Sequence, residues 1–153
     1  MADSIDRQPI FIETFAARHL DDVARLEREC FVTPWSHEGL AEELSNPLAV
    51  FRVAVLDGQA VGYAGMHHIL DEGYITNIAV SSAHRRKGIG RSLLTELLEY
   101  GKKLDMGFLT LEVRVSNAAA IALYASLDFK EQGVRPDFYT GPTEDALIMT
   151  YKF

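Results

Sequence analysis

The segment from Tyr74 to Leu98 constrains the fold more than any other part of this chain. Residues 74–80 are rich in Ile, Val, Thr and Tyr, a composition typical of a buried strand. The leucines that follow recur at helical spacing, which predicts a helix over Leu93, Leu94, Leu97 and Leu98. Between strand and helix lies a loop of three cations and two glycines, made of Arg85, Arg86, Lys87, Gly88, Ile89 and Gly90.

This cation–glycine loop predicts a pyrophosphate site. A helix N-terminus presents unpaired N–H groups and the positive end of the helix dipole, and glycine lets a ligand approach the backbone closely. The chain has no Gly-x-x-x-x-Gly-Lys-Ser/Thr motif, which excludes a P-loop. Leu93 stands where the dinucleotide fingerprint needs its third glycine. Taken alone, such a loop is equally typical of a solvated turn, but its place between a strand and an apolar helix favours the anion site.

Length and composition indicate one globular domain. A chain of 153 residues, 48% of them hydrophobic, is expected to fold as a single domain over 1–153, with residues 1–9 as a flexible N-terminal segment. Cys30 is the single cysteine, which favours a reducing cytoplasm over an oxidising compartment. No apolar run indicates a signal peptide or a membrane span. A net charge of −7 argues against direct nucleic-acid binding and permits a basic substrate.

Periodicity and turn residues divide the chain into strands and helices. Strands are expected at residues 10–15, 50–56, 60–69, 74–80, 108–115, 130–134 and 146–153. Helices are expected at about 20–31, at 36–44, after the cation–glycine loop and at about 118–127, with Ser36 and Asn117 as N-caps. The pair Asp57-Gly58 predicts a tight hairpin. A loop containing Pro136 and Gly141-Pro142 is expected between the last two strands.

Several motifs, in this order of elements, resemble one enzyme family. The phrase Arg85-x-x-Gly88-x-Gly90 is similar to the acyl-CoA loop of the GNAT N-acetyltransferases. Other segments resemble the RimI group of ribosomal-protein alanine N-acetyltransferases, namely Pro34-Trp35-Ser36 and residues 77–80, 111–114, 116–124 and 144–146. Two positions depart from that pattern, because Asp128 replaces a glycine and Phe138 replaces a tyrosine.

The resemblance implies a fold and a donor. The fold is an α/β (α+β) GNAT-like domain with a central mixed, mostly antiparallel sheet flanked by helices. The donor is acetyl-CoA, whose pyrophosphate would lie on the loop from Arg85 to Gly90. The backbone of Ile78, Ala79 and Val80 would pair with the pantetheine arm like an added strand. Asn117 would contact CoA, although a helix N-cap is an equally good explanation of this residue.

Two residues are candidates for proton transfer. Alternation along residues 108–115 places Glu112 on the face opposite Leu111 and Val113, where it could be the polar side of a half-exposed strand. By resemblance Glu112 is the general base, acting directly or through water, with Glu72 as the second candidate. Tyr124 could be a core aromatic residue, and by resemblance it protonates the CoA thiolate.

The resemblance also implies an acceptor site. Trp35 would form part of a wall where a peptide docks, unless it packs in the core, and Tyr139, Glu72, Glu144 and Asp145 would lie near the bound acceptor. No metal is expected, because His67, His68 and His84 lack partners at ligand spacing.

The expected function is transfer of an acetyl group to the N-terminal alanine of a small-subunit ribosomal protein. The alternatives are a relative that acetylates lysine side chains or a small amine, and a catalytically silent acyl-CoA-binding module that regulates a partner. The protein is expected to be cytoplasmic, without direct contact to nucleic acid or membrane, and a monomer is favoured over an oligomer.

Overall fold

The computed structural model describes residues 9–153, so most of the segment expected to be flexible, residues 1–8, lies outside the described part. The first half contains β1 (Ile10–Thr14), η1 (Ala17–His19), α2 (Leu20–Cys30), α3 (His37–Glu43), β2 (Ala49–Leu56), β3 (Gln59–Ile69) and β4 (Glu72–Val80). The second half contains η2 (Ser82–His84), α4 (Ile89–Lys103), β5 (Phe108–Arg114), α5 (Ala118–Ser126), β6 (Lys130–Tyr139) and β7 (Glu144–Lys152).

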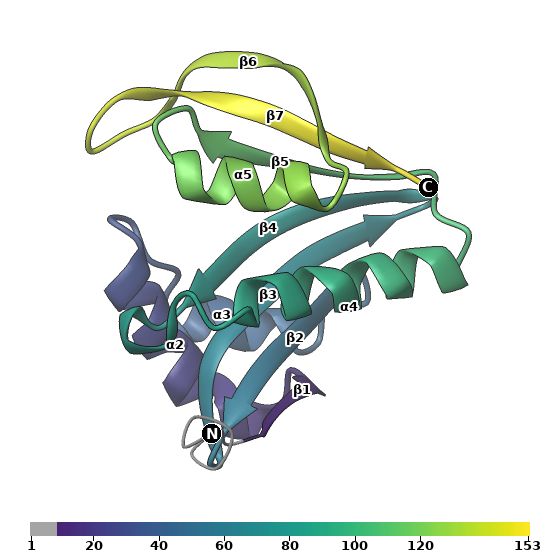
Figure 1. Ribbon diagram of the computed structural model, residues 1–153. Helices are drawn as coiled ribbons and strands as arrows, with labels where there is room; N and C mark the ends of the chain where they lie inside the picture. Colours follow the sequence, from purple (N-terminus) through teal and green to yellow (C-terminus); the bar gives the residue numbers. More distant parts are fainter. Residues whose placement is uncertain (1–8) are drawn as a thin grey trace, which may run out of the picture.

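Within these residues the strands form one sheet in the order β1-β2-β3-β4-β5-β7-β6 (Figure 1). Neighbouring strands are antiparallel except β4 and β5, which are parallel. The sheet is therefore mixed and mostly antiparallel, which confirms the expected fold class. The β2–β3 hairpin turns at Asp57 and Gly58, both with positive φ, as that dipeptide predicts.

Two hydrophobic clusters cover the two faces of the sheet. On one face, α4 and α5 pack leucines and Tyr124 against the strands, with Leu93, Leu94 and Leu97 fully buried. On the other face, α2 and α3 bury Val23, Leu26 and Leu40 against residues of β2 and β3. The amphipathic stripes that the sequence contains on the helices thus become the two halves of the core.

The sheet opens between β4 and β5. The two strands pair only at Glu72↔Phe108, Gly73↔Leu109 and Tyr74↔Thr110. Beyond Tyr74 they diverge, as Figure 1 shows, and the ladder pairs of residues 75 and 77–80 of β4 are with β3 alone. An unpaired strand edge inside a sheet exposes backbone N–H and C=O groups to a ligand.

Three strand limits differ from expectation by two residues or more, and one of them is the start of β7, which lies at Glu144 where residue 146 was expected. β4 begins at Glu72, two residues before the expected start, because Glu72 and Gly73 pair with both neighbouring strands. β6 runs through Pro136 to Tyr139, whereas a loop was expected there. Proline fits in this strand because β6 is at the sheet edge and its pairing with β7 is interrupted between Arg135 and Tyr139.

No helix within residues 9–153 has the length and apolar character needed to cross a membrane.

Candidate active site

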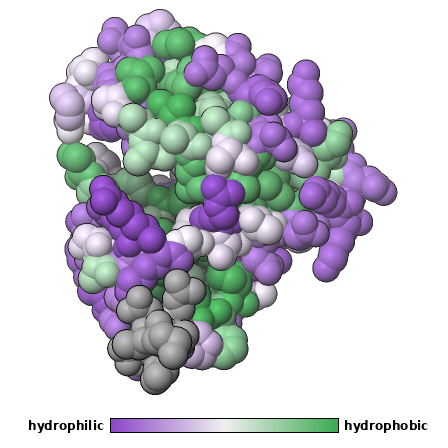
Figure 2. All heavy atoms as spheres, viewed as in Figure 1, coloured by the Kyte–Doolittle hydropathy of each residue, from purple (hydrophilic) through white to green (hydrophobic). Residues whose placement is uncertain are grey.

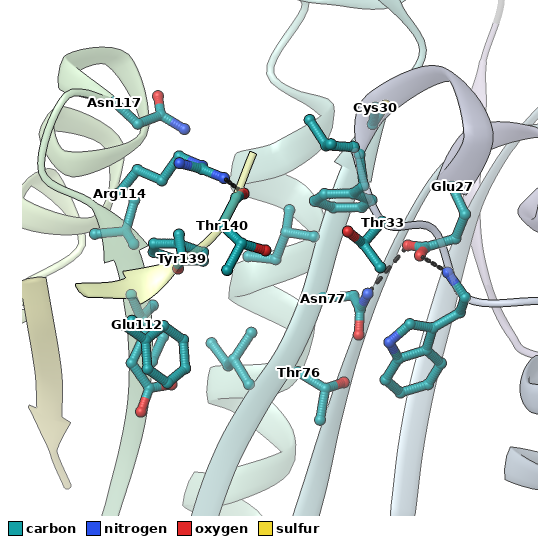
Figure 3. A pocket seen from close by; sticks show the side chains of 18 of the residues that line it. Glu27, Cys30, Thr33, Thr76, Asn77, Glu112, Arg114, Asn117, Tyr139 and Thr140 are labelled. Atoms are coloured by element: carbon teal, nitrogen blue, oxygen red, sulfur yellow. Dashed lines mark hydrogen bonds between the residues drawn. The ribbon is translucent and has the colours of Figure 1, made fainter. Parts of the chain in front are cut away.

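A cavity of about 510 Å³ lies where β4 and β5 separate. It is visible as a hollow between the two halves of the surface in Figure 2 and from close by in Figure 3. Its walls come from α2 and the following loop, from β4, from β5, from α5 and from the end of β6. The residues among them that the sequence singled out are Trp35, Ile78, Glu112, Asn117, Tyr124 and Tyr139.

Glu112 reaches the cavity from β5. The burial of this strand alternates, with Leu109, Leu111 and Val113 buried and the intervening residues half-buried, as the period of two predicts. The Glu112 side chain is 30% exposed, and its Oε1 lies 3.2 Å from Nε of Arg135 on β6. A carboxylate at this place is open to solvent and forms part of the cavity wall.

Tyr124 reaches the cavity from α5. The residue is 9% exposed, and its ring contacts Phe129 at a centroid distance of 5.9 Å. Burial, with a smaller contribution from Tyr139, raises the pKa of Tyr124 to about 12. The phenol therefore keeps its proton throughout the neutral range and can donate one hydrogen bond into the cavity.

Arg114 holds the β6–β7 loop against β5. Its guanidinium donates to the carbonyl oxygens of Thr140 and Pro142 and to Glu144 Oε1, at 2.8, 2.9 and 3.1 Å. It also stacks on the ring of Tyr139, 4.6 Å from the centroid. These contacts fix the cavity wall that Tyr139 forms, and Figure 3 shows both side chains at its edge.

The predicted acceptor residues do not all lie together. Glu144 accepts from the Ser116 N–H and from Arg114, and Asp145 accepts from the Asp137 N–H, so both fix the loop at the cavity edge. Glu72 lies at the paired end of β4 and accepts from the Tyr74 hydroxyl at 2.5 Å. These three residues are absent from the cavity lining.

The cation–glycine loop leads from η2 into α4. Gly88, at φ 79°, is the N-cap of α4, and within residues 9–153 no side chain caps this helix. The first-turn N–H groups are therefore free for a ligand. A Cβ built on Gly88 would meet nothing within 4 Å, so the loop is open above the backbone. Arg86 and Lys87 are exposed beside it, which fits a doubly charged pyrophosphate.

Arg85 is turned away from this opening. Its Nε donates to the Val80 carbonyl oxygen at 3.1 Å, and an outer nitrogen lies 3.6 Å from Cys30 Sγ. Arg85 therefore connects the loop to the end of β4 and to α2. Asn117 accepts from the Ala120 N–H at 3.2 Å, so the N-cap explanation of this residue is confirmed, and it also lines the cavity.

A β-bulge shapes the wall that β4 contributes. Asn77 pairs with Gly65 and Ile75 with Met66, which leaves Thr76 as the extra residue. The Thr76 hydroxyl donates to the Gly65 carbonyl oxygen at 3.2 Å. Bulges redirect the side chains beside them and are frequent next to active sites.

Glu27 and Asn77 line the cavity, although neither was expected there from the sequence. Glu27 is fully buried, and its carboxylate accepts from Asn77 Nδ2 and from the backbone N–H of Trp35, as Figure 3 shows. The available signal was a glutamate inside the apolar stripe of α2. A charged residue on a buried helix face requires hydrogen-bond partners in the core.

Comparison with known proteins shows the family to which this chain belongs. Residues 20–129 match the model of the acetyltransferase (GNAT) family, which is more than half of the chain. The chain belongs to the GNAT acetyltransferase family. The predicted enzyme class, an N-acetyltransferase that uses acetyl-CoA, is thereby confirmed, as is the resemblance to the RimI group.

Individual GNAT relatives are similar over nearly the whole length. The chain is 36% identical to the ribosomal protein bS18-alanine N-acetyltransferase of Escherichia coli over 140 residues, covering 90% of this chain and 94% of that one. It is 35% identical to the N-alpha-acetyltransferase RimI of Mycobacterium tuberculosis, covering 94% and 93%. The crystal structure of the E. coli ribosomal-protein-S18-alanine N-acetyltransferase matches with a TM-score of 0.87 at 34% identity, covering 94% of each chain.

Among residues 9–153, no group of three or more His, Cys, Asp or Glu side chains is arranged to hold a metal ion.

Proposed function

We propose that this GNAT enzyme acetylates the N-terminal alanine of a small-subunit ribosomal protein. The observation that carries the proposal is the position of Glu112 and Tyr124, which line one cavity from β5 and α5, at the point where β4 and β5 separate. A base and a hydrogen-bond donor on the walls of one cavity suit an acyl transfer that removes a proton at one end and stabilises a leaving group at the other.

The donor would lie along β4. The open edge of residues 75–80 offers backbone groups to the amides of the pantetheine arm, and the uncapped N-terminus of α4 offers N–H groups to the pyrophosphate. The Val80 carbonyl oxygen already accepts from Arg85 and Cys30, and the backbone of Ala79 faces its partner Tyr63 on β3, so Ile78 is better placed for new pairing. The thioester would then point into the cavity.

The residues divide the chemistry as follows. The neutral amine attacks the thioester carbonyl carbon, and its surplus proton passes to the Glu112 carboxylate, directly or through one water. The carbon–sulfur bond then breaks, and its electron pair leaves on the CoA sulfur. Tyr124 donates a hydrogen bond to that sulfur. With a pKa of about 12, Tyr124 is a weak acid beside a thiol of about 8.5, so it stabilises the thiolate without giving up its proton for long.

An α-amine suits this site better than a lysine side chain. Its pKa is about 7.7–8.0 against about 10.4 for lysine, so near pH 7 roughly a tenth of it is already neutral. That fraction is several hundred times larger than the fraction of neutral lysine. One half-exposed carboxylate, Glu112, can therefore be sufficient as base. Glu72, the second candidate, lies outside the cavity lining.

The ribosomal acceptor is supported by the relatives, two of which carry bS18-alanine or N-alpha-acetyltransferase activity in their names. Such an acceptor is basic, which suits a chain of net charge −7. We place the reaction in the cytoplasm and favour a monomer.

The test is mass spectrometry of ribosomal proteins from cells with and without this chain. We expect one small-subunit protein beginning with alanine to gain the mass of one acetyl group only when the chain is present and its Glu112 is intact. An unchanged set of ribosomal N-termini would refute the acceptor. Absence of any CoA release with peptides would favour the alternative, a silent acyl-CoA-binding module.

A further inference from the structure

The cavity contains a buried carboxylate without a cationic partner. Glu27 is 0% exposed and lines the cavity from α2. Its Oε1 accepts from the Trp35 N–H at 2.8 Å, and its Oε2 accepts from the Tyr63 hydroxyl at 2.5 Å and from Asn77 Nδ2 at 3.0 Å. Three donors around one carboxyl group match its ionised form, which only accepts hydrogen bonds.

The other charges of the cavity wall are compensated. Besides Glu27, the charged lining residues are Glu112 and Arg114, which pair with Arg135 and Glu144 respectively. Among residues 9–153, no ion pair includes Glu27. Its negative charge is therefore the uncompensated one in the wall, and burial protects it from screening by salt.

The hydrogen bond to Glu27 fixes the orientation of the Asn77 side-chain amide, whose oxygen carries a partial negative charge. Because Asn77 Nδ2 must donate to Glu27, the amide is held in one orientation, and Figure 3 shows its oxygen directed away from Glu27. This Oδ1 is buried and has no hydrogen-bond partner within residues 9–153. The carboxylate polarises the amide, which increases the negative partial charge on that oxygen.

The acceptor changes charge during the reaction. It arrives mostly as an ammonium ion and leaves as a neutral amide. We propose that Glu27 is a specificity-determining residue, whose buried charge makes the cavity bind the cationic N-terminus of the unmodified acceptor in preference to the acetylated product. This inference rests on the proposed function and adds to it the group that separates substrate from product.

The experiment measures two dissociation constants by calorimetry on the enzyme saturated with CoA, which cannot transfer an acetyl group. The probes are a basic peptide beginning with alanine and the same peptide N-acetylated. The wild type should bind the free peptide more tightly. Glu27→Gln keeps the shape and removes the charge. In this variant the dissociation constant of the acetylated peptide divided by that of the free peptide should fall by roughly ten-fold, because losing one interaction with a charged group costs about that factor in affinity. The affinity for CoA should not change.

Two controls separate charge from structure. Tyr63→Phe removes one hydrogen-bond donor and keeps the charge, so its ratio should stay near that of the wild type. Glu96→Gln removes one charge from the exposed surface of α4 and should also leave the ratio unchanged. If Glu27→Gln does not fold, the double variant Glu27→Gln/Tyr63→Phe removes the charge and a donor together, which leaves fewer buried groups unpaired.

An unchanged ratio in Glu27→Gln, or in the double variant, would overturn the inference, and so would an equal fall in Tyr63→Phe. If the wild type acetylates the free peptide but the ratio of dissociation constants is the same in Glu27→Gln, this inference alone is contradicted. If the wild type acetylates no α-amine, the proposed function is contradicted instead.

Discussion

Arg135 on β6 forms an ion pair with Glu112, with Nε 3.2 Å from Oε1. The same carboxylate is the proposed base, so the ammonium of an acceptor must compete with a guanidinium for it. The Arg135 side chain is 56% exposed, and exposed pairs contribute only about 0–1 kcal/mol. Arg135 therefore moderates access to Glu112 without closing the cavity.

Replacing Arg135 by glutamine should accordingly strengthen acceptor binding. We expect the KM for a peptide acceptor to fall by up to about five-fold, the equivalent of 1 kcal/mol, with the acetyl-CoA affinity unchanged. Steady-state kinetics at low ionic strength measure this, with Lys102→Gln on α4 as the charge-matched control. A higher KM in Arg135→Gln would show that Arg135 contacts the acceptor.

Acetyl-CoA should stabilise the wild type, raising its melting temperature with ligand concentration. Gly88→Glu and Gly90→Glu should abolish that rise, because each brings a negative side chain to the phosphate site, and at Gly88 the φ of 79° also disfavours a side chain. Gly133→Glu is the control, since its Cβ also meets nothing within 4 Å but lies on β6. An undiminished rise in both loop variants would place the donor elsewhere.

Much of the fold could be predicted because local signals agree with it. The Asp57-Gly58 turn, the leucines of α4 and the alternation in β5 each specify an element that the structure contains. The predicted end of β6 was wrong, because Pro136 indicates a loop unless the strand is known to lie at the edge of the sheet. Edge position depends on which strands pair, and local sequence does not contain that information.

The site was harder to predict for the same reason. Tyr124 and Glu112 were found through motifs, whereas none of those motifs includes Glu27. Its importance comes from Tyr63 and Asn77, which lie 36 and 50 residues further along the chain. Glu72 was expected near the acceptor through the family resemblance, as a residue just before the central strand, but the cavity opens at the other end of that strand.

Removing the Tyr124 hydroxyl should slow turnover with little effect on acetyl-CoA binding. We expect Tyr124→Phe to lose about 10²–10⁴-fold in kcat, the usual range for acid–base assistance. Because burial raises the pKa of Tyr124 to about 12, wild-type activity should not decline through loss of this proton between pH 7 and about 10, the ordinary pKa of tyrosine. Turnover near the wild-type rate would make Tyr124 a packing residue.

Glu144 should stabilise the fold only at pH values at which its carboxyl group is ionised. The hydrogen bond from Ser116, followed by Arg114, lowers the pKa of its carboxyl group. A lowered folded-state pKa gives stability that is present above the unfolded-state pKa and lost as pH falls through the folded-state value. Glu144→Gln should therefore lower the melting temperature at pH 7, and the difference should narrow as the pH falls below about 4.3. A difference in melting temperature that stays constant from pH 7 to pH 3 would indicate that Glu144 stabilises the fold by packing and not by its charge.

The acceptor class is tested most directly by comparing the acetylation rates of two amines. The purified enzyme is given acetyl-CoA and one of two matched basic peptides, one with a free N-terminal alanine and no lysine, the other N-blocked with one internal lysine. Release of free CoA is followed for both, with Glu112→Gln as the inactive control. We expect rapid acetylation of the free N-terminus and little acetylation of the lysine. Faster acetylation of the blocked lysine peptide would contradict this expectation.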